Sequence, residues 1–205
     1  MKKIGVFLDR DGVINSLVHK RGVIDSPFTI RQFRLLPGVG TAVRRLNRLG
    51  LKVVVVSNQP GVAKGNFTAG ALREMTEKME RGLRRSGARL DGIYYCLHHP
   101  QARIKKYRAR CVCRKPMPGL LVRASREMGL DLRTSFMVGD NLTDIEAGKA
   151  AGCTTLFIGD WKCDICRHMK TKKVKPDHIA RDIMDAVRIV KKIVSGRGLA
   201  RMHAD

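Results

Sequence analysis

The sequence has 205 residues, a length that suits one domain with a hydrophobic core of its own. No apolar run approaches the ~20 residues that span a bilayer, and the apolar stretch at residues 4–8 is too short for a signal peptide. We therefore expect a soluble, cytoplasmic monomer with no membrane partner. Its 41 Lys and Arg against 18 Asp and Glu give a formal net charge of +23, which attracts anions without choosing among them.

Five short apolar runs have the Val, Ile, Phe and Tyr content of strands that are buried on both faces. They lie at residues 3–9, 52–57, 92–96, 135–140 and 154–160. Amphipathic helical patterns alternate with them, at residues 37–50, 67–87 and 142–152, and in a stripe made of Ile179, Ile183, Val187, Val190 and Val194. This alternation predicts an α/β fold: a Rossmann-like three-layer sandwich with a central parallel sheet.

The domain organisation follows from the lengths of the connecting segments. No long insertion follows the first or the second strand, so we expect no large cap domain. An open site would then be shaped by residues 16–30 and by the cysteine-containing loop at residues 96–113. We expect a single domain over residues 1–195 and a frayed tail at residues 196–205, because chain termini are ordered only where they are tied down.

Polar side chains follow three of the predicted strands, where each strand ends. In an open parallel sheet, ligands bind at the carboxyl ends of the strands, so these residues should meet at one edge. They are Asp9 and Asp11, then Ser57, Asn58 and Gln59, then Asp140 and Asp144. Any one of these patterns is weak, because turns use Asp freely. Their joint occurrence in this order favours a functional site.

Clustered carboxylates favour Mg²⁺, which takes few protein ligands and accepts phosphate oxygens as others. A carboxylate beside the ion can attack phosphorus, and a second one can protonate the leaving oxygen and then activate water. Phosphoryl transfer also needs hydrogen-bond donors and cations around the phosphoryl oxygens. Ser57 and Lys115 offer a hydroxyl and an ammonium group for that purpose.

The loop at residues 96–113 has the spacing C-x-H-x12-C-x-C, which provides Cys96, His98, Cys111 and Cys113. Three thiolates and one imidazole form a closed tetrahedral Zn²⁺ site of the structural type. Two unrelated cysteine pairs in a flexible loop are the alternative. The basic side chains of the loop are either solvated or attract an anionic substrate; they are Arg103, Lys105, Lys106, Arg108 and Arg110.

A second pair, Cys163 and Cys166, has C-x-x-C spacing and is followed by His168 and His178. It is open to three interpretations: another zinc site, a redox pair, or exposed thiols in a basic loop. We expect exposed thiols, because C-x-x-C alone supplies two ligands and a tetrahedral site needs four.

Four segments resemble the motifs of the haloacid dehalogenase superfamily of phosphatases: "FLDRDGVIN", "VVVVSNQPGVAKG", "CRKPMPG" and "MVGDNLTD". The segments "DGIYYCLHHP" and "CVCRKPMPGLL" more closely resemble the D-glycero-D-manno-heptose-1,7-bisphosphate 7-phosphatases, with the related histidinol-phosphate phosphatases second. The resemblance runs from about residue 4 to residue 158. Its most specific part is the Cys/His spacing, which also favours His98 over His99 as a ligand.

The resemblance implies roles for individual residues. Asp9 would be the nucleophile and Asp11 the general acid and base, while Ser57 and Lys115 would hold the transferring phosphoryl group. Mg²⁺ would bind at Asp9, the Asp11 backbone carbonyl, Asp140 and Asn141, supported by Asp144. Substrate contacts are expected from Asn15, Lys20, Asn58, Gln59 and Arg114. Many relatives carry Lys where this chain has Asn141, which puts one local contact in question.

The expected activity is Mg²⁺-dependent removal of the 7-phosphate of a heptose 1,7-bisphosphate, a small phosphorylated sugar, through an aspartyl-phosphate intermediate. The product would enter the synthesis of nucleotide-activated heptose for surface glycans. A histidinol-phosphate phosphatase is the alternative within the same chemistry. A basic, zinc-stabilised nucleic-acid-binding protein is the alternative of another class. The 5% aromatic content disfavours the latter, since single-strand binding relies on aromatic stacking.

Overall fold

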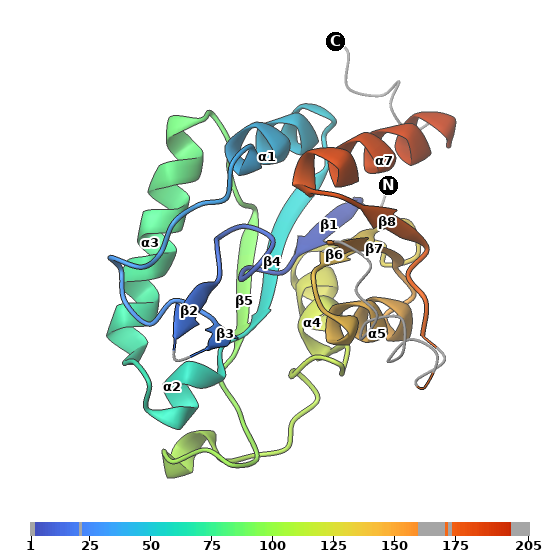
Figure 1. Ribbon diagram of the computed structural model, residues 1–205. Helices are drawn as coiled ribbons and strands as arrows, with labels where there is room; N and C mark the ends of the chain where they lie inside the picture. The colour runs from blue at the N-terminus through green and yellow to red at the C-terminus, as the bar shows by residue number, and fades with distance from the viewer. Residues whose placement is uncertain (1–2, 21, 160–170, 172–173, 198–205) are drawn as a thin grey trace.

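The computed structural model describes residues 3–20, 22–159, 171 and 174–197. Its centre is a six-stranded sheet in which every neighbouring pair is parallel, in the order β5-β4-β1-β6-β7-β8 (Figure 1). The strands are β1 (Gly5–Leu8), β4 (Lys52–Asn58), β5 (Gly92–Cys96), β6 (Phe136–Gly139), β7 (Thr154–Ile158) and β8 (His178–Ala180). The predicted α/β fold with a central parallel sheet is confirmed.

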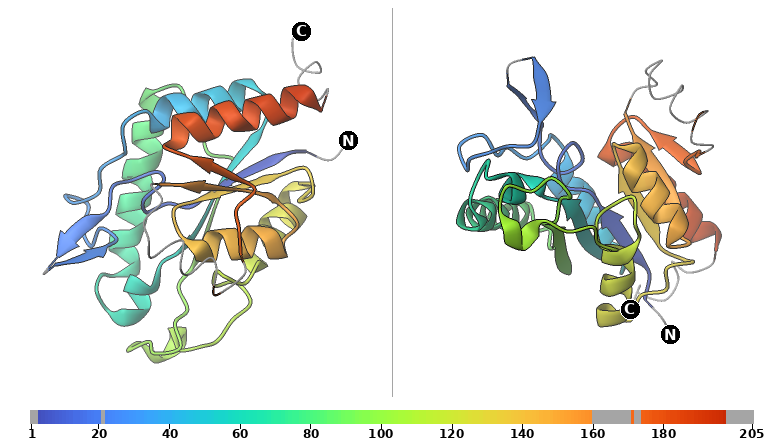
Figure 2. Two further views of the ribbon diagram at one scale, coloured as in Figure 1. Left: turned by 45° about the vertical axis from the view of Figure 1, so that its right-hand side comes forward. Right: turned by 90° about the horizontal axis from the view of Figure 1, so that it is seen from below.

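Alternate side chains of the central strands enter two hydrophobic cores, one on each face of the sheet. Val53 and Val55 of β4 belong to one core, and Val54 and Val56 belong to the other. The first core is covered by α1 (Val39–Arg48), α3 (Ala69–Arg85) and α7 (Ile183–Gly196), and the second by α4 (Gly119–Met128) and α5 (Leu142–Ala150). Figure 1 and the left view of Figure 2 show α1 and α7 side by side. These are the three predicted layers.

Two helix starts follow local sequence signals. The Thr68 side chain caps α3 by accepting a hydrogen bond from the Ala71 amide, as its position predicts. The chain enters α7 through Asp182, whose side chain accepts from the Asp185 amide. One expectation at this end is wrong. Ile179 does not belong to the helical stripe but lies in β8, where it pairs with Phe157 of β7.

The connections at the carboxyl edge of the sheet contain only small elements within the described ranges. Between β1 and α1 the chain forms an antiparallel hairpin of β2 (Val18–Lys20) and β3 (Val23–Asp25), which extends from the body of the molecule in the right view of Figure 2. After β4 comes the short helix α2 (Pro60–Lys64), and the loop after β5 holds a 3-10 turn, η1 (Lys105–Tyr107). Within the described ranges, no larger insertion covers this edge.

Two expectations fall on residues outside the described ranges: the Cys163–Cys166 pair, and all but the first two residues of the predicted frayed tail. Gly196, counted with that tail, is the last residue of α7. No helix in the part of the chain that the structure describes is long and apolar enough to cross a membrane.

Candidate active site

The predicted polar residues meet where three neighbouring strands end. Asp9 follows β1, Ser57 and Asn58 close β4, and Asp140 follows β6; these strands are adjacent in the order β4-β1-β6. Beyond them lies a pocket of about 440 Å³. It is lined by Asp9, Asp11, Leu17, Ile24, Asp25, Ser26, Ser57, Asn58, Pro60, Arg114, Lys115, Asp140, Asn141, Thr143 and Asp144. The hairpin therefore supplies one wall, as expected of residues 16–30, and the segment after the cysteine loop supplies another.

Three carboxylates crowd the base of the pocket. One oxygen from each of Asp9, Asp140 and Asp144 lies within 4.8 Å of the others. Burial, reinforced by the charges of Asp9 and Asp144, raises the pKa of Asp140 to about 8. Burial likewise raises the pKa of Asp144. The raised pKa values mean that negative charge on these carboxylates is not fully balanced by the protein around them.

Lys115 is the cation of this cluster. Its Nζ lies 2.8 Å from Asp9 Oδ1 and 2.5 Å from Asp144 Oδ1, and it donates to the Val56 carbonyl at 3.0 Å. Only 3% of the residue is exposed. Burial alone would lower the pKa of Lys115, but the carboxylates of Asp144 and Asp9 outweigh it and raise that pKa, so the ammonium stays charged.

The cluster fits a divalent cation. Lys115 places one positive charge against three carboxylates, and clustered carboxylate oxygens are the donors that Mg²⁺ prefers. The backbone comes close as well: a Cβ on Gly12 would lie 1.9 Å from Asp140 Oδ2, and Gly12 has a φ of +86°. Any other residue there would be strained and would displace Asp140.

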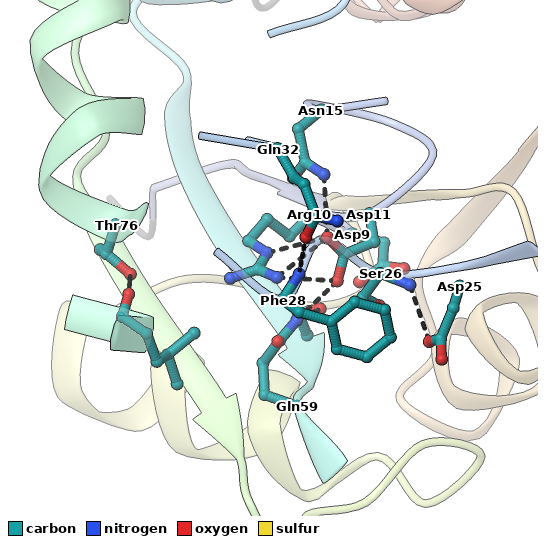
Figure 3. A network of polar contacts seen from close by, with 12 residues as sticks. Asp9, Arg10, Asp11, Asn15, Asp25, Ser26, Phe28, Gln32, Gln59 and Thr76 are labelled. Carbon is teal, nitrogen blue, oxygen red and sulfur yellow. Dashed lines mark hydrogen bonds and ion pairs between the residues drawn. The ribbon is translucent and has the colours of Figure 1, made fainter. Parts of the chain in front are cut away.

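Asp11 reaches the pocket but is held from the protein side. Its carboxylate accepts hydrogen bonds from Arg10, Asn15 and Gln59, all of which are almost fully buried (Figure 3). Asn15 and Gln59, expected to contact substrate, do not line the main pocket. Gln59 also donates to Ser57 Oγ at 3.1 Å. Sequence reasoning missed Arg10, since a charged residue between two aspartates carries no local signal of burial.

Of the remaining predicted site residues, Arg114 and Asn141 line the pocket and Lys20 does not. Arg114 lines the pocket, and its Nη1 donates to the His98 carbonyl at 3.3 Å. Asn141 lines the pocket too, but its side chain caps α5 by accepting from the Thr143 amide at 3.2 Å. The Asn141 amide in turn donates to Asp144 Oδ2 at 3.1 Å, which completes a capping box. Lys20 lies in β2. The roles expected of these residues stay predictions.

The four residues of the C-x-H-x12-C-x-C pattern come together at the end of β5. The ligand atoms of Cys96, His98, Cys111 and Cys113 all lie within 4.8 Å of one another, and the cysteines form no disulfides. Cys113 Sγ lies 3.3 Å from Cys96 Sγ, 3.2 Å from Cys111 Sγ and 3.4 Å from His98 Nδ1. The neighbouring His99 instead accepts a hydrogen bond from the Gln101 amide through Nδ1.

These spacings fit a tetrahedral zinc site. Zn–S bonds of about 2.3 Å place the ligands of a tetrahedron about 3.8 Å apart, close to the separations in the cluster. Burial raises the pKa of the Cys96 thiol, so a cation is needed to hold that sulfur as a thiolate. The donor set therefore fits structural zinc.

Known proteins that are similar to this chain include phosphatases. A family model described as "HAD-hyrolase-like" matches residues 112–186. The D-glycero-beta-D-manno-heptose-1,7-bisphosphate 7-phosphatase of Photorhabdus laumondii is 43% identical over 194 residues, which cover 93% of this chain and 95% of that protein. The Pasteurella multocida protein of the same name is 42% identical over 95% of this chain and 100% of its own length. The chain belongs to the D-glycero-D-manno-heptose-1,7-bisphosphate 7-phosphatase family. It is thus a phosphatase of the haloacid dehalogenase superfamily, a phosphoric monoester hydrolase.

A solved structure of this phosphatase family has the same fold. The D,D-heptose 1,7-bisphosphate phosphatase from B. bronchiseptica matches with a TM-score of 0.77 and 28% identity, over 92% of this chain and 98% of that one. That protein was crystallised in complex with magnesium and phosphate.

Proposed function

We propose that this chain removes the 7-phosphate of D-glycero-D-manno-heptose 1,7-bisphosphate. The observation that carries the proposal is Asp9 at the base of the 440 Å³ pocket, paired with a buried lysine and beside two further carboxylates. The two relatives at 42–43% identity, both named for this activity, support the choice of substrate. Removal of this phosphate supplies the monophosphate needed for making nucleotide-activated heptose.

In the proposed first step, an Asp9 oxygen attacks phosphorus. The bond between phosphorus and the sugar oxygen breaks with its electron pair on that oxygen, which takes a proton from the Asp11 carboxyl group. Lys115 and the Ser57 hydroxyl lie in the same pocket, where they can meet the oxygens of the phosphoryl group. The charge on these oxygens needs donors that are already in place.

In the proposed second step, the Asp11 carboxylate takes a proton from water while the water oxygen attacks phosphorus. The bond to Asp9 breaks, which releases inorganic phosphate and restores the Asp9 carboxylate and the Asp11 carboxyl group. Arg114 lines the pocket and can meet the substrate's second phosphate or its hydroxyl groups.

We assign Mg²⁺ to Asp9, Asp140 and the backbone carbonyl of Asp11, with Asn141 and Asp144 at the same end of the pocket. The bound ion would offset the charge of the phosphoryl group and of the carboxylates around it. We assign structural zinc to Cys96, His98, Cys111 and Cys113, which tie the loop at residues 96–113 in place ahead of Arg114 and Lys115.

The regiochemistry tests this function. Phosphorus-31 NMR of heptose 1,7-bisphosphate with the enzyme and Mg²⁺ should show loss of the 7-phosphate signal while the 1-phosphate signal persists. Inorganic phosphate should appear in equal amount. Loss of the 1-phosphate instead, or no release in the presence of Mg²⁺, would refute the assignment.

A further inference from the structure

The carboxylate of Asp11 is held by hydrogen bonds from three residues that do not line the pocket. Oδ1 accepts from Arg10 Nε at 3.1 Å, Arg10 Nη2 at 2.9 Å and Asn15 Nδ2 at 2.9 Å. Oδ2 accepts from Arg10 Nη2 at 3.0 Å and Gln59 Nε2 at 2.7 Å. Figure 3 shows these three donors converging on one side chain. Arg10 alone contacts both oxygens, so it fixes the plane of the carboxylate as well as its place.

Arg10 is itself held by the core. The residue is fully buried, and its guanidinium lies 5.8 Å from the ring centre of Phe33 and 5.7 Å from that of Tyr95. The Tyr95 hydroxyl is hydrogen-bonded to Thr76 of α3 at 3.0 Å. A buried cation must be paired, so its position and that of Asp11 are coupled. The position of Asp11 therefore depends, through Arg10, on side-chain packing at β5 and α3.

The backbone contributes to the same arrangement. The Arg10 carbonyl accepts hydrogen bonds from the Ile14 and Asn15 amides, at 2.8 and 3.0 Å. The Gly12 amide donates to the Asn15 carbonyl at 2.8 Å. This tight loop returns Asn15 to Asp11, so one short segment of chain supplies both the gripped carboxylate and two of its three partners.

We propose that Arg10 is the positioning residue for the general acid and base of this enzyme. Arg10 does not line the pocket and so does not touch substrate. It acts by holding the Asp11 carboxylate in one plane, with Asn15 and Gln59 completing the grip, so that Asp11 meets the leaving oxygen in a fixed geometry. This inference rests on the role assigned to Asp11 under the proposed function.

A purely structural role for Arg10 makes a different prediction. A buried ion pair that only pins the end of β1 would, when weakened, lower stability and slow every substrate alike. A positioning residue for proton transfer matters only where the leaving oxygen needs a proton. An alkoxide leaving from a sugar needs one, whereas p-nitrophenolate leaves without one. The identity of the leaving group therefore separates the two roles.

The test uses Arg10→Lys in the full chain, with zinc and saturating Mg²⁺. Lysine keeps the buried charge but cannot form the planar fork that spans both oxygens. Rapid-quench measurement gives the first-turnover rate with heptose 1,7-bisphosphate and with p-nitrophenyl phosphate. We expect a loss of about 10- to 100-fold with the sugar phosphate and less than about 3-fold with the aryl phosphate. Arg44→Lys, on α1 and outside the pocket, is the matched control and should change neither rate.

Asp11→Asn, measured in parallel, tests the role of Asp11 separately from the role of Arg10. A split by leaving group in Asp11→Asn with no split in Arg10→Lys overturns the inference about Arg10 and leaves the role of Asp11 intact. No split in Asp11→Asn overturns both. Equal losses of Arg10→Lys on the two substrates assign Arg10 a structural role only. If Arg10→Lys does not fold, Gln59→Met takes its place. This variant removes one of the two donors to Oδ2 and should show a smaller split of the same sign.

Discussion

Asn58 and Lys115 are joined by a pair of hydrogen bonds. The Asn58 side-chain amide donates to the Lys115 carbonyl at 3.0 Å, and its oxygen accepts from the Lys115 amide at 3.0 Å. Asn58 is the last residue of β4, whereas Lys115 follows the cysteine loop. The backbone of the pocket's buried cation is thus fixed to the sheet directly, in addition to any constraint from metal in the loop.

This pairing makes Lys115 a fixed charge, and its removal should be costly. We expect Lys115→Ala to lower kcat and to raise KM, because the ammonium meets charge that grows in the transition state. The loss in kcat/KM should be about 100-fold or more, as for other preorganised donors. Lys52→Ala is the control, since Lys52 pairs with Asp91 at the opposite end of β4. Unchanged kinetics in Lys115→Ala would remove this residue from the site.

Asp9→Asn should abolish turnover and leave the fold intact. The substitution keeps the shape of the side chain but replaces the nucleophilic carboxylate, one of three in the cluster, by a neutral amide. Steady-state phosphate release and thermal unfolding, measured on the same sample, check both halves of this prediction. Near-normal turnover in a folded Asp9→Asn variant would exclude covalent catalysis by this residue.

We expect one tightly bound zinc ion per chain, held by the cluster at the end of β5. Metal analysis of the purified protein should show this ion lost in Cys111→Ser and kept in Cys153→Ser. Cys153 is a suitable control because it lies buried outside the cluster, where burial raises the pKa of its thiol to about 12.

The same analysis decides the role of the second cysteine pair. The double variant Cys163→Ser/Cys166→Ser should keep its zinc and its full activity. Two zinc ions in the wild-type chain, with one lost in this variant, would reveal a second metal site.

Asp177, directly before the edge strand β8, should make a contribution to the free energy of unfolding that depends on pH. Its carboxylate accepts from the Thr155 amide at 2.8 Å and the Thr155 hydroxyl at 2.9 Å, and it forms an ion pair with Lys149. Burial opposes the charge, but the Lys149 and Thr155 contacts outweigh it and lower the pKa of Asp177. A lowered pKa stabilises the folded state above the unfolded pKa of about 4, and the contribution is lost as the pH falls through the folded value.

Asp177→Asn should therefore lower the free energy of unfolding at pH 7 by about 1 kcal/mol, since it removes charge-assisted hydrogen bonds. The difference from wild type should shrink toward pH 3. Denaturant titrations at pH 7 and at pH 3 measure it. A difference that stays constant over this range would mean that the charge of Asp177 contributes nothing.

The sequence predicts those parts of the structure whose signals are local and strong. The buried central strands are continuous apolar runs, and the positions of Asp9, Ser57 and Asp140 follow from the rule that strand ends share an edge. The Cys/His cluster at the end of β5 could also be predicted, because the spacing of its four residues is itself the chemical signal. A strand of three residues gives no such signal, so the hairpin was missed, and β8 was merged into the helical stripe that follows it.

Arg10 shows a different limit. A charged residue between two aspartates resembles a solvated surface residue, and nothing in the linear pattern says otherwise. Its burial arises from Phe33 and Tyr95, which lie 23 and 85 positions away in the sequence and converge only in the fold. Asn15 and Gln59 were expected to contact substrate, a role that stays a prediction. Their hydrogen bonds to Asp11 depend on the same tertiary packing and have no signal in the sequence.

The measurement that tests the central claim most directly is a comparison of kcat/KM across a panel of phosphate esters, with Mg²⁺ present and then removed by chelation. The panel holds both anomers of heptose 1,7-bisphosphate, histidinol phosphate and a 3′-phosphorylated oligonucleotide. We predict that kcat/KM for one heptose anomer is at least about 100-fold higher than kcat/KM for histidinol phosphate or for the oligonucleotide. Removal of Mg²⁺ by chelation should abolish turnover of that anomer. A higher kcat/KM for histidinol phosphate or for the oligonucleotide, or full activity without Mg²⁺, would contradict the account.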